Sequence, residues 1–160
     1  MGVEFIDNSI KCRKMIGDAG IAWLYEACGE VEAQAKRNSK RASGDTAGSF
    51  RYKVDETSME GYVGSDHENA IWEEFGTGEY ALNGDGRNGG WWIEVGSGRN
   101  QIPLAVAKKY RWVKVRKDKN GNLAYVFTKG KKPRRSFFKA YTSLKGKLQR
   151  RAEEILGGIE

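Results

Sequence analysis

The sequence predicts an α+β fold, in which an antiparallel sheet is packed by a long N-terminal helix and a C-terminal amphipathic helix. Apolar residues recur at helical spacing near both ends of the chain. Between them lie short stretches of alternating or β-branched and aromatic residues, two of them separated by an Asn-Gly pair. The 160 residues fall within the size range of one domain, so we expect a single domain over 1–160.

The first predicted element is a helix over residues 9–38. Asp7 and Asn8 offer side-chain oxygens for its N-cap, and residues 3–6 before them form either a short strand or a tail. The apolar stripe that we expect to face the core consists of Ile16, Trp23, Leu24, Ala27, Cys28, Val31 and Ala35. Three glycines, Gly17, Gly20 and Gly29, interrupt the pattern and suit close packing.

Two strands are predicted within residues 49–66, because Phe50, Tyr52 and Val54 alternate with charged residues. A short helix follows over residues 68–75. Its expected apolar side carries Ala70, Ile71, Trp72 and Phe75. Its expected solvated side carries Glu68, Glu73 and Glu74.

A long loop or insert is predicted over residues 76–111, since residues 76–98 hold eight of the 21 glycines and only 91–95 has an ordered pattern. A hairpin over 112–128 has Asn120-Gly121, the favoured type I′ pair, in its turn. The last helix is predicted over 136–156, with Ser136 as its N-cap. Its apolar stripe consists of Phe137, Tyr141, Leu144, Leu148, Ala152 and Ile155.

Charge is segregated along the chain, which has a formal net charge of +7. Residues 54–98 hold ten acidic side chains and one basic side chain, Arg87, whereas residues 99–151 hold eighteen basic side chains and one acidic side chain, Asp118. A basic face can bind nucleic-acid phosphates. It can equally meet the acidic face of a neighbouring copy, which gives head-to-tail association.

Cys12 and Cys28 are sixteen residues apart in one predicted helix, about 24 Å along its axis, so we expect both to be reduced. One histidine and no closely spaced cysteine pair make a zinc site unexpected. No apolar run is long enough for a membrane span, and no signal-peptide pattern opens the chain. We therefore expect a protein made and kept in a cytoplasm, without cofactors.

Several stretches resemble sites with chemistry. Residues 84–89 match G-x-G-x-x-G, but a strand-like stretch follows instead of a helix, which favours a flexible loop over a dinucleotide site. Adjacent Glu73 and Glu74 point about 100° apart on a helix and cannot easily share an acid–base site. A partner for Glu74 would be Glu94 or Asp66, and nothing in the sequence indicates that pairing.

Two further candidates need weighing. His67, between Asp66 and Glu68, is a possible base, although a lone histidine is more often structural or exposed. The basic run 129–135 can follow phosphates while aromatic side chains stack on bases. The candidate stacking residues are Tyr110, Trp112, Tyr125 and Phe127. The simpler interpretation is a solvated connector beside core aromatics.

Residues 68–77 read ENAIWEEFGT, and residues 132–141 read KPRRSFFKAY. In their order and spacing, these two segments resemble the tail-completion or head–tail joining proteins of long-tailed bacteriophages. The first keeps the Glu-Phe-Gly-Thr of that family, and the second is similar to its Pro-Arg-Pro-Phe cap. Residues 45–51, DTAGSFR, are similar to its Thr-Gly-x-Leu-Arg segment. The resemblance covers about residues 10–155; Arg135 replaces the second proline, and the insert 79–111 is longer than in the family.

This resemblance implies a structural virion protein of the neck, present in the host cytoplasm during assembly. Such proteins form a ring, usually sixfold, between the head-closure or connector protein and the tail tube or tail terminator, and are often monomeric before assembly. Genomic DNA can pass through the channel of such a ring. The implied interface residues are Glu74, Phe75, Gly76, Thr77, Gly78, Arg87, Trp91, Trp92, Lys131, Lys132, Pro133, Arg134 and Arg135. The implied structural residues are Trp23, Trp72, Phe137, Tyr141, Leu144 and Leu148.

Within that family, the segment at 68–80 is expected to be a structural corner. Glycines let the chain leave the short helix sharply, Glu74 is a candidate partner of Arg134, and Phe75 and Phe137 are expected to hold helix ends against the sheet. The segments 36–48 and 76–98 are candidates for ordering on assembly and for first cleavage by proteases.

Two alternatives to the neck protein remain open. One is a small basic nucleic-acid-binding protein, which predicts binding to duplex DNA that weakens steeply with added salt. The other is an enzyme that uses His67 or Glu74, which predicts a perturbed pKa in a cleft. We expect no enzymatic activity.

Overall fold

The computed structural model describes residues 9–39 and 44–158, which form two compact units with mixed helix and sheet. Unit 1 comprises Met1–Ala70 and Ser136–Glu160, and unit 2 comprises Ile71–Arg135. The α+β fold class predicted from the sequence is confirmed. The single domain over 1–160 stays a prediction.

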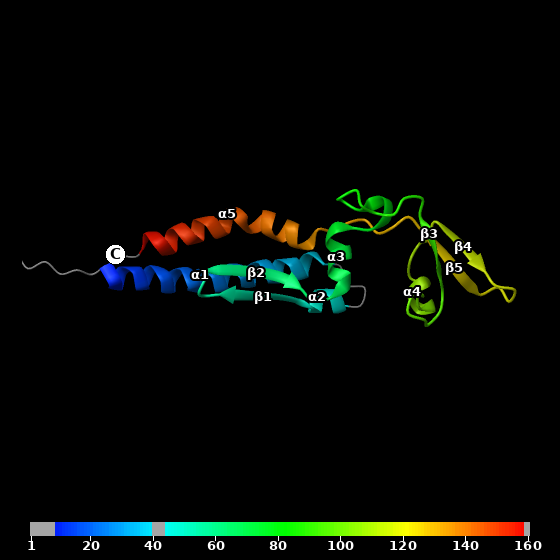
Figure 1. Cartoon of the computed structure of the whole chain (residues 1–160), viewed down its shortest axis with the longest axis horizontal. Helices are drawn as coiled ribbons and strands as arrows, with labels where there is room; N and C mark the ends of the chain where they lie inside the picture. Colours follow the sequence, from blue (N-terminus) through cyan, green and yellow to red (C-terminus); the bar gives the residue numbers. More distant parts are fainter. Residues whose placement is uncertain (1–8, 40–43, 159–160) are drawn as a thin grey trace, which may run out of the picture. The chain divides into compact units, whose positions relative to one another are not determined.

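Unit 1 is arranged around its longest helix, α1 (Ser9–Asn38). A hairpin of β1 (Phe50–Asp55) and β2 (Glu60–Ser65) packs on α1, and so does α5 (Ser136–Gly157). Figure 1 shows α5 and the hairpin each lying beside α1. A single turn, α2 (Asp45–Gly48), precedes the hairpin.

The core of unit 1 is small and lies where α1, the β1–β2 hairpin and α5 meet the start of α3 (Glu68–Phe75). Ala35, Phe50, Ala70 and Ala140 are buried together, with Val31 and Phe137 packed against them. The rings of Phe50 and Phe137 are 4.4 Å apart between centroids. Phe137 therefore holds the start of α5 against the hairpin, as the sequence predicts.

Hydrogen bonds and ion pairs join the two long helices of unit 1. The indole Nε1 of Trp23 donates to the carbonyl oxygen of Leu148 at 3.2 Å. Lys147 and Arg151 of α5 pair with glutamates of α1, at 2.6 Å and 3.2 Å. Of the stripe predicted on α5, Leu148 is buried and Leu144 half-buried, whereas Tyr141 is exposed.

A glycine in β2 brings the hairpin close to α1. A Cβ at Gly61 would collide with the Sγ of Cys28 and would lie 3.5 Å from Leu24. Burial raises the pKa of the Cys28 thiol, which keeps it protonated and weakly reactive. Cys12 lies in the same helix, but its side chain, like residues 3–6, Asp7 and Asn8, lies outside the described part.

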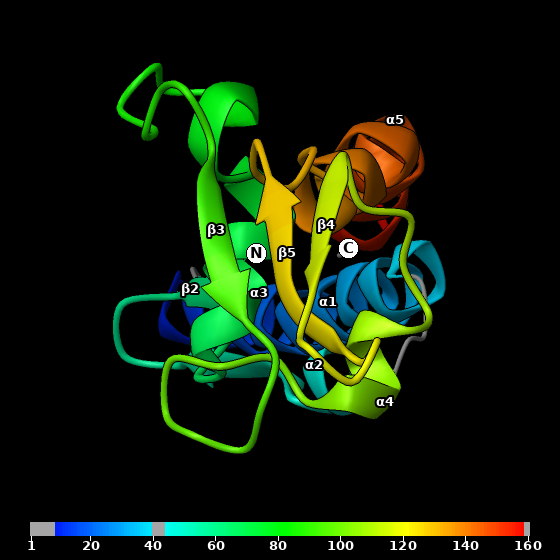
Figure 2. The ribbon, with the colours of Figure 1, turned by 90° about the vertical axis from the view of Figure 1, so that its right-hand side faces the viewer.

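Unit 2 contains a second, three-stranded sheet with the antiparallel order β3-β5-β4. Its strands are β3 (Trp91–Glu94), β4 (Lys114–Lys117) and β5 (Leu123–Thr128). Figure 2 shows β5 between the other two. The expectation of one sheet covered by both long helices is therefore wrong, because each hairpin pairs within its own unit and α5 packs on α1.

Element boundaries agree closely with the sequence, except in the glycine-rich region. The helices predicted at 9–38 and 68–75 are observed at those bounds, the latter as α3 (Glu68–Phe75), which begins in unit 1 and ends in unit 2. Within 76–111 the structure adds a 3₁₀ turn, η1 (Gly78–Tyr80), and a short helix, α4 (Leu104–Ala107), to the ordered strand β3. The prediction of a loop was wrong for these short elements.

Two local predictions are wrong. Gly121 has a positive φ of 80° but Asn120 does not, so the β4–β5 turn is not type I′; Asp118 instead accepts hydrogen bonds from the backbone N–H groups of Asn120 and Asn122, each at 2.8 Å. Ser136 is not an N-cap, because it is the first residue of α5 and its buried hydroxyl has no hydrogen-bond partner among the described residues.

Candidate functional site

Two segments of unit 2 that are distant in the sequence, 73–79 and 129–134, lie side by side. The N–H of Thr77 donates to the carbonyl of Lys131, and the N–H of Lys131 donates to Oγ1 of Thr77, both at 2.9 Å. The N–H of Glu79 donates to the carbonyl of Lys129, also at 2.9 Å. These bonds bring the two ends of unit 2 together, and we call this region the junction, comprising residues 73–79 and 129–134.

Glu73 is the buried carboxylate of the junction, with 9% of its surface exposed. Its Oε1 lies 2.8 Å from Nζ of Lys131, and its Oε2 lies 3.6 Å from Nη1 of Arg134. Its carbonyl accepts a hydrogen bond from the backbone N–H of Arg134 at 2.7 Å. A buried carboxylate is stable when cations and donors surround it in this way.

Glycines permit the close approach of backbones at the junction. Gly76 and Gly78 have φ values of 78° and 61°, in the left-handed region. A Cβ at Gly76 would lie 2.7 Å from the carbonyl oxygen of Tyr80 and 2.9 Å from Cδ of Pro133. A Cβ at Gly78 would collide with the carbonyl oxygen of Lys129. Glycine is therefore needed at positions 76 and 78, because a larger residue would clash with the facing segment.

The faces of α3 agree with the sequence prediction only at Glu68, which is exposed, and at Ala70, which is buried. Glu73, expected in solvent, is buried, whereas Ile71, Trp72 and Phe75, expected on the apolar side, are 54%, 51% and 45% exposed. The reason is that the polar side of the helix packs against the basic segment at the other end of unit 2. Only Ala70 of the predicted apolar side is buried.

A second feature of unit 2 is a hollow of about 520 Å³. Five of its lining residues are aromatic, namely Tyr80, Trp91, Tyr110, Trp112 and Phe127, and of these Phe127 has its ring on the Trp92 face of the sheet. The lining also contains five basic side chains, namely Arg111, Lys129, Lys131, Lys132 and Arg134. The remaining lining residues are aliphatic residues, threonines and a glycine, so no carboxylate faces the hollow.

Three of the five cations of the hollow already form ion pairs within unit 2, with two carboxylates. Lys131 and Arg134 pair with Glu73, and Lys129 pairs with Glu79 at 3.1 Å. Among the described residues, no carboxylate forms an ion pair with Arg111 or Lys132. The ammonium of Lys132 instead lies 5.6 Å from the ring centroid of Tyr80.

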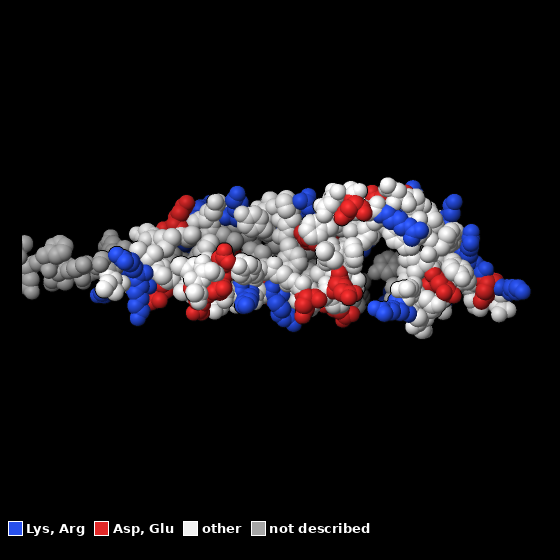
Figure 3. Space-filling model, viewed as in Figure 1, with Lys and Arg blue, Asp and Glu red and all other residues white. Residues whose placement is uncertain are grey.

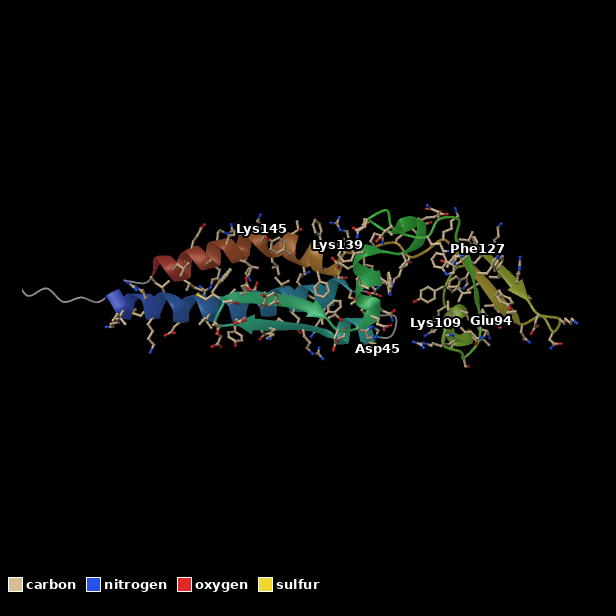
Figure 4. All side chains as sticks on the ribbon, in the orientation of Figure 1. Asp45, Glu94, Lys109, Phe127, Lys139 and Lys145 are labelled. Carbon is tan, nitrogen blue, oxygen red and sulfur yellow. The ribbon has the colours of Figure 1, made fainter. Side chains whose placement is uncertain are left out.

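The sheet of unit 2 has aromatic residues beside cations on its other face. Trp92, Phe127 and Lys114 pair directly across the three strands, so their side chains share one face. The guanidinium of Arg116 lies 4.2 Å from the centroid of the Trp92 ring, and Phe127 is marked in Figure 4. Trp91 points to the hollow, and Arg87 lies 5.7 Å from its centroid.

The distribution of charge follows the two units. Unit 2 has fourteen Lys and Arg against six Asp and Glu, a formal net charge of +8, whereas unit 1 has fourteen against fifteen, a net charge of −1. In the view of Figure 3, acidic and basic side chains are intermingled over α1 and its hairpin. The excess of positive charge of the chain therefore resides in unit 2.

The residues considered for catalysis do not form a site together. Nδ1 of His67 accepts a hydrogen bond from the N–H of Asn69 at 3.1 Å, which is a local turn at the start of α3. Glu94 accepts a hydrogen bond from Nε2 of Gln101 at 2.8 Å. The G-x-G-x-x-G stretch precedes β3 instead of a helix. Over 9–39 and 44–158, no group of three or more potential ligands is arranged for a metal ion.

The sequence missed the importance of Glu73 and Arg111. Glu73 was assigned to solvent by helical periodicity, and the signal that could have identified it is the basic run 131–135, which needs a carboxylate partner. The hypothesis that Glu74 pairs with Arg134 stays a prediction. Arg111 stands between Tyr110 and Trp112 in the sequence, and this alternation of cation and aromatic rings is a usable signal.

The predicted linker 36–48 falls partly outside the described residues, since 40–43 are not described. Within it, residues 36–38 end α1 and residues 45–48 form α2. None of the described helices is long and apolar enough to cross a membrane. Comparison with protein-family models, with curated proteins and with solved structures found no match.

Proposed function

We propose that this chain is a structural subunit of the neck of a long-tailed bacteriophage or prophage. In this role it is a tail-completion or head–tail joining protein that forms a ring, of six copies by analogy with the family it resembles. Its partners are the head-closure or connector protein on one side and the tail tube or tail terminator on the other. The protein performs no catalysis in this role.

The junction is the observation that supports the proposal most strongly. The Glu-Phe-Gly-Thr segment (74–77) and the Lys-Pro-Arg-Arg segment (132–135) are more than fifty residues apart in the sequence, yet each contacts the residue directly before the other. Thr77 hydrogen-bonds to Lys131, and Glu73 pairs with Arg134. Motifs that meet in space without a catalytic group between them fit a structural corner. The insert 79–111, which is longer than in the family, lies within unit 2 between the two halves of that corner.

Exposed apolar side chains beside the junction offer a surface for assembly. Ile71, Trp72 and Phe75 are each about half exposed on α3, and aromatic residues are enriched at protein interfaces. In a ring each copy contacts its two neighbours through two different surfaces. The ring therefore closes because of the angle between these surfaces and not because of one tight contact. The charge difference between the units suits contacts of this heterologous kind.

The experiment that tests this proposal is deletion of the gene in a phage or prophage that carries it, followed by negative-stain electron microscopy of the lysate. We expect DNA-filled heads and finished tails that are not joined. A plasmid copy of the natural gene should restore joined particles, and a copy encoding Glu73→Gln should restore fewer than one encoding Asp85→Asn. Normal virions from the deletion strain would overturn the proposal.

The alternative of a small basic nucleic-acid-binding protein is favoured by one observation, the +8 net charge of unit 2. The deletion experiment separates the two roles, since a nucleic-acid-binding protein outside the neck would leave heads and tails joined. Whether unit 2 suits single-stranded or double-stranded nucleic acid depends on the shape of its surface.

A further inference from the structure

We infer that the hollow of unit 2 is a binding site for single-stranded nucleic acid, in which a base lies against the aromatic wall and phosphates contact Arg111 and Lys132. This inference does not rest on the neck role. It follows from three properties of the hollow, namely its lining, its unneutralised cations and the charge around it.

The lining suits a planar base. Tyr80, Trp91, Tyr110 and Trp112 line the hollow, and Ile93, Ile102, Val106 and Val113 supply further apolar surface. Proteins bind single strands by stacking bases on aromatic side chains in a positively charged groove. The volume of about 520 Å³ lies within the range of about 300–1,000 Å³ found for small-ligand pockets, and is large enough for one nucleotide.

The cations suit a phosphate. Lys129, Lys131 and Arg134 pair with only two carboxylates, Glu79 and Glu73, so most but not all of their positive charge is balanced. Arg111 and Lys132 have no carboxylate in ion-pair distance among the described residues, and none of the lining residues is acidic. A bound phosphate would therefore supply the negative partner that neither Arg111 nor Lys132 has among the described residues.

A single strand suits the hollow better than a duplex. In a duplex the bases are paired and stacked, so they cannot enter a concave site, whereas the bases of a single strand are available for stacking on side chains. The +8 charge of unit 2 attracts either form, and this attraction weakens with salt. The hollow therefore favours a single strand over a duplex, which net charge alone does not do.

An acidic segment of a second copy is the competing occupant. The densest acidic group in unit 1 is at the β1–β2 turn, with Asp55, Glu56 and Glu60. These carboxylates already accept hydrogen bonds, from the N–H groups of Thr57 and Ser58 and from the hydroxyls of Tyr25 and Tyr62. Unit 1 as a whole carries a net charge of −1, so it does not present a polyanion.

The test measures binding of a fluorescein-labelled oligothymidine of about 20 nucleotides to the full-length chain by fluorescence anisotropy. The double variant Arg111→Glu with Lys132→Glu changes the hollow. The control Lys139→Glu with Lys145→Glu makes the same change of net charge on α5 of unit 1, where both residues are marked in Figure 4. Circular dichroism establishes that each variant is folded.

We expect the natural chain to bind the single strand more tightly than a duplex of the same length, and to lose affinity between about 50 and 200 mM salt. The hollow variant should bind at least about tenfold more weakly and the control variant less than about threefold more weakly. Tyr110→Leu, which leaves the charge unchanged at a side chain that is 48% exposed, should weaken binding by about threefold or more.

Four results would overturn the inference. Equal weakening by both charge variants would mean attraction by net charge alone, and tighter binding of the duplex would exclude a base in the hollow. Self-association in sedimentation velocity that the hollow variant abolishes and the control variant retains would assign the hollow to a second copy. If the charge variant does not fold, Tyr110→Leu with unchanged affinity would overturn the inference by itself.

Discussion

The two units of this protein differ in secondary structure, in net charge and in aromatic content. Unit 1 has long helices, one small apolar core and nearly balanced charge, whereas unit 2 has short strands, a net charge of +8 and four of the five tryptophans. Aromatic and basic residues that are not needed for a core are available for binding. The comparison teaches that unit 1 carries the architecture and that unit 2 carries the surfaces suited to recognition.

The interiors of the units differ in the same way. Unit 1 is held by apolar burial around Phe50, which is 1% exposed. Unit 2 buries few large side chains, with Val126 at 0% and Ala107 at 1% exposed, and it buries the carboxylate Glu73. Hydrogen bonds and ion pairs at the junction therefore have a larger role in unit 2. The predictions below test this difference, beginning with the largest expected effect.

Phe50→Ala should lower the free energy of unfolding of unit 1 by about 3–5 kcal/mol, because it removes a buried ring that packs on Phe137. Urea unfolding followed by far-ultraviolet circular dichroism measures the change, since most helical residues are in α1 and α5. Tyr52→Ala, in the same strand but 40% exposed, should cost less than about 1.5 kcal/mol. Equal costs for the two variants would contradict a core centred on Phe50.

Gly78→Ala should lower stability by about 2–4 kcal/mol, because the alanine must adopt a left-handed conformation and its Cβ also collides with the backbone of Lys129. Gly84→Ala is the matched control, since Gly84 has a φ of 71° but nothing within 4 Å of the position that a Cβ would take. It should cost only about 1–2 kcal/mol. Thermal unfolding followed by tryptophan fluorescence, which reports mainly on unit 2, measures both; equal losses would show that the junction is not tightly packed.

Glu73→Gln should lower the stability of unit 2 by about 1–3 kcal/mol, since it removes the charge that faces Lys131 and Arg134. The effect is smaller than for a fully buried pair because the Lys131 side chain is 43% exposed. Asp85→Asn, an exposed carboxylate of unit 2, should change stability by less than about 0.5 kcal/mol. Tryptophan fluorescence during urea unfolding measures the stability of both variants. A Glu73→Gln variant as stable as the natural chain would show that the ion pairs of Glu73 do not stabilise unit 2.

Asp118 should give the smallest effect, confined to the β4–β5 turn. Hydrogen bonds from the backbone of Asn122, and then from its side chain and from other turn residues, hold the pKa of this carboxyl below its ordinary value. Its stabilising contribution is therefore present above the unfolded pKa of about 3.9 and is lost as pH falls through the lower folded pKa. Carboxyl-carbon NMR titration should show this direction, and Asp118→Asn should abolish the associated shift changes of the turn amides; a raised pKa would contradict the turn geometry.

Patterns within one segment allowed much of the fold to be predicted. The α1 bounds follow from a stripe of apolar residues that includes Ala27 and Ala35, both of which are buried. The α3 bounds were equally clear, but its faces were not. Glu73 finds its partners 58 and 61 residues further along the chain, and helical periodicity contains no information about such distant contacts.

In the glycine-rich region, too, contacts between distant segments decide what the local sequence pattern does not. Residues 76–111 have the composition of a loop, yet β3 and α4 form within it because Trp91–Glu94 pairs with β5 and the indole of Trp112 donates to the carbonyl of Ala107 at 2.7 Å. The hollow is likewise built from distant segments. Of the stacking candidates that the sequence indicates, Tyr110, Trp112 and Phe127 are lining residues but Tyr125 is not. Tyr80 and Trp91 join the lining through contacts that the sequence does not reveal.

The measurement that tests the division of the chain most directly is removal of the distal part of unit 2. In the natural chain, Glu79 and Lys129 are joined by a backbone hydrogen bond of 2.9 Å, so Asn-Gly can replace residues 81–127 and connect Tyr80 to Thr128. The account predicts that this shortened chain keeps cooperative unfolding and the NMR shifts of α1, the β1–β2 hairpin and α5, while it loses affinity for the oligothymidine. A shortened chain that is unfolded would show that unit 1 depends on unit 2 and would contradict the division.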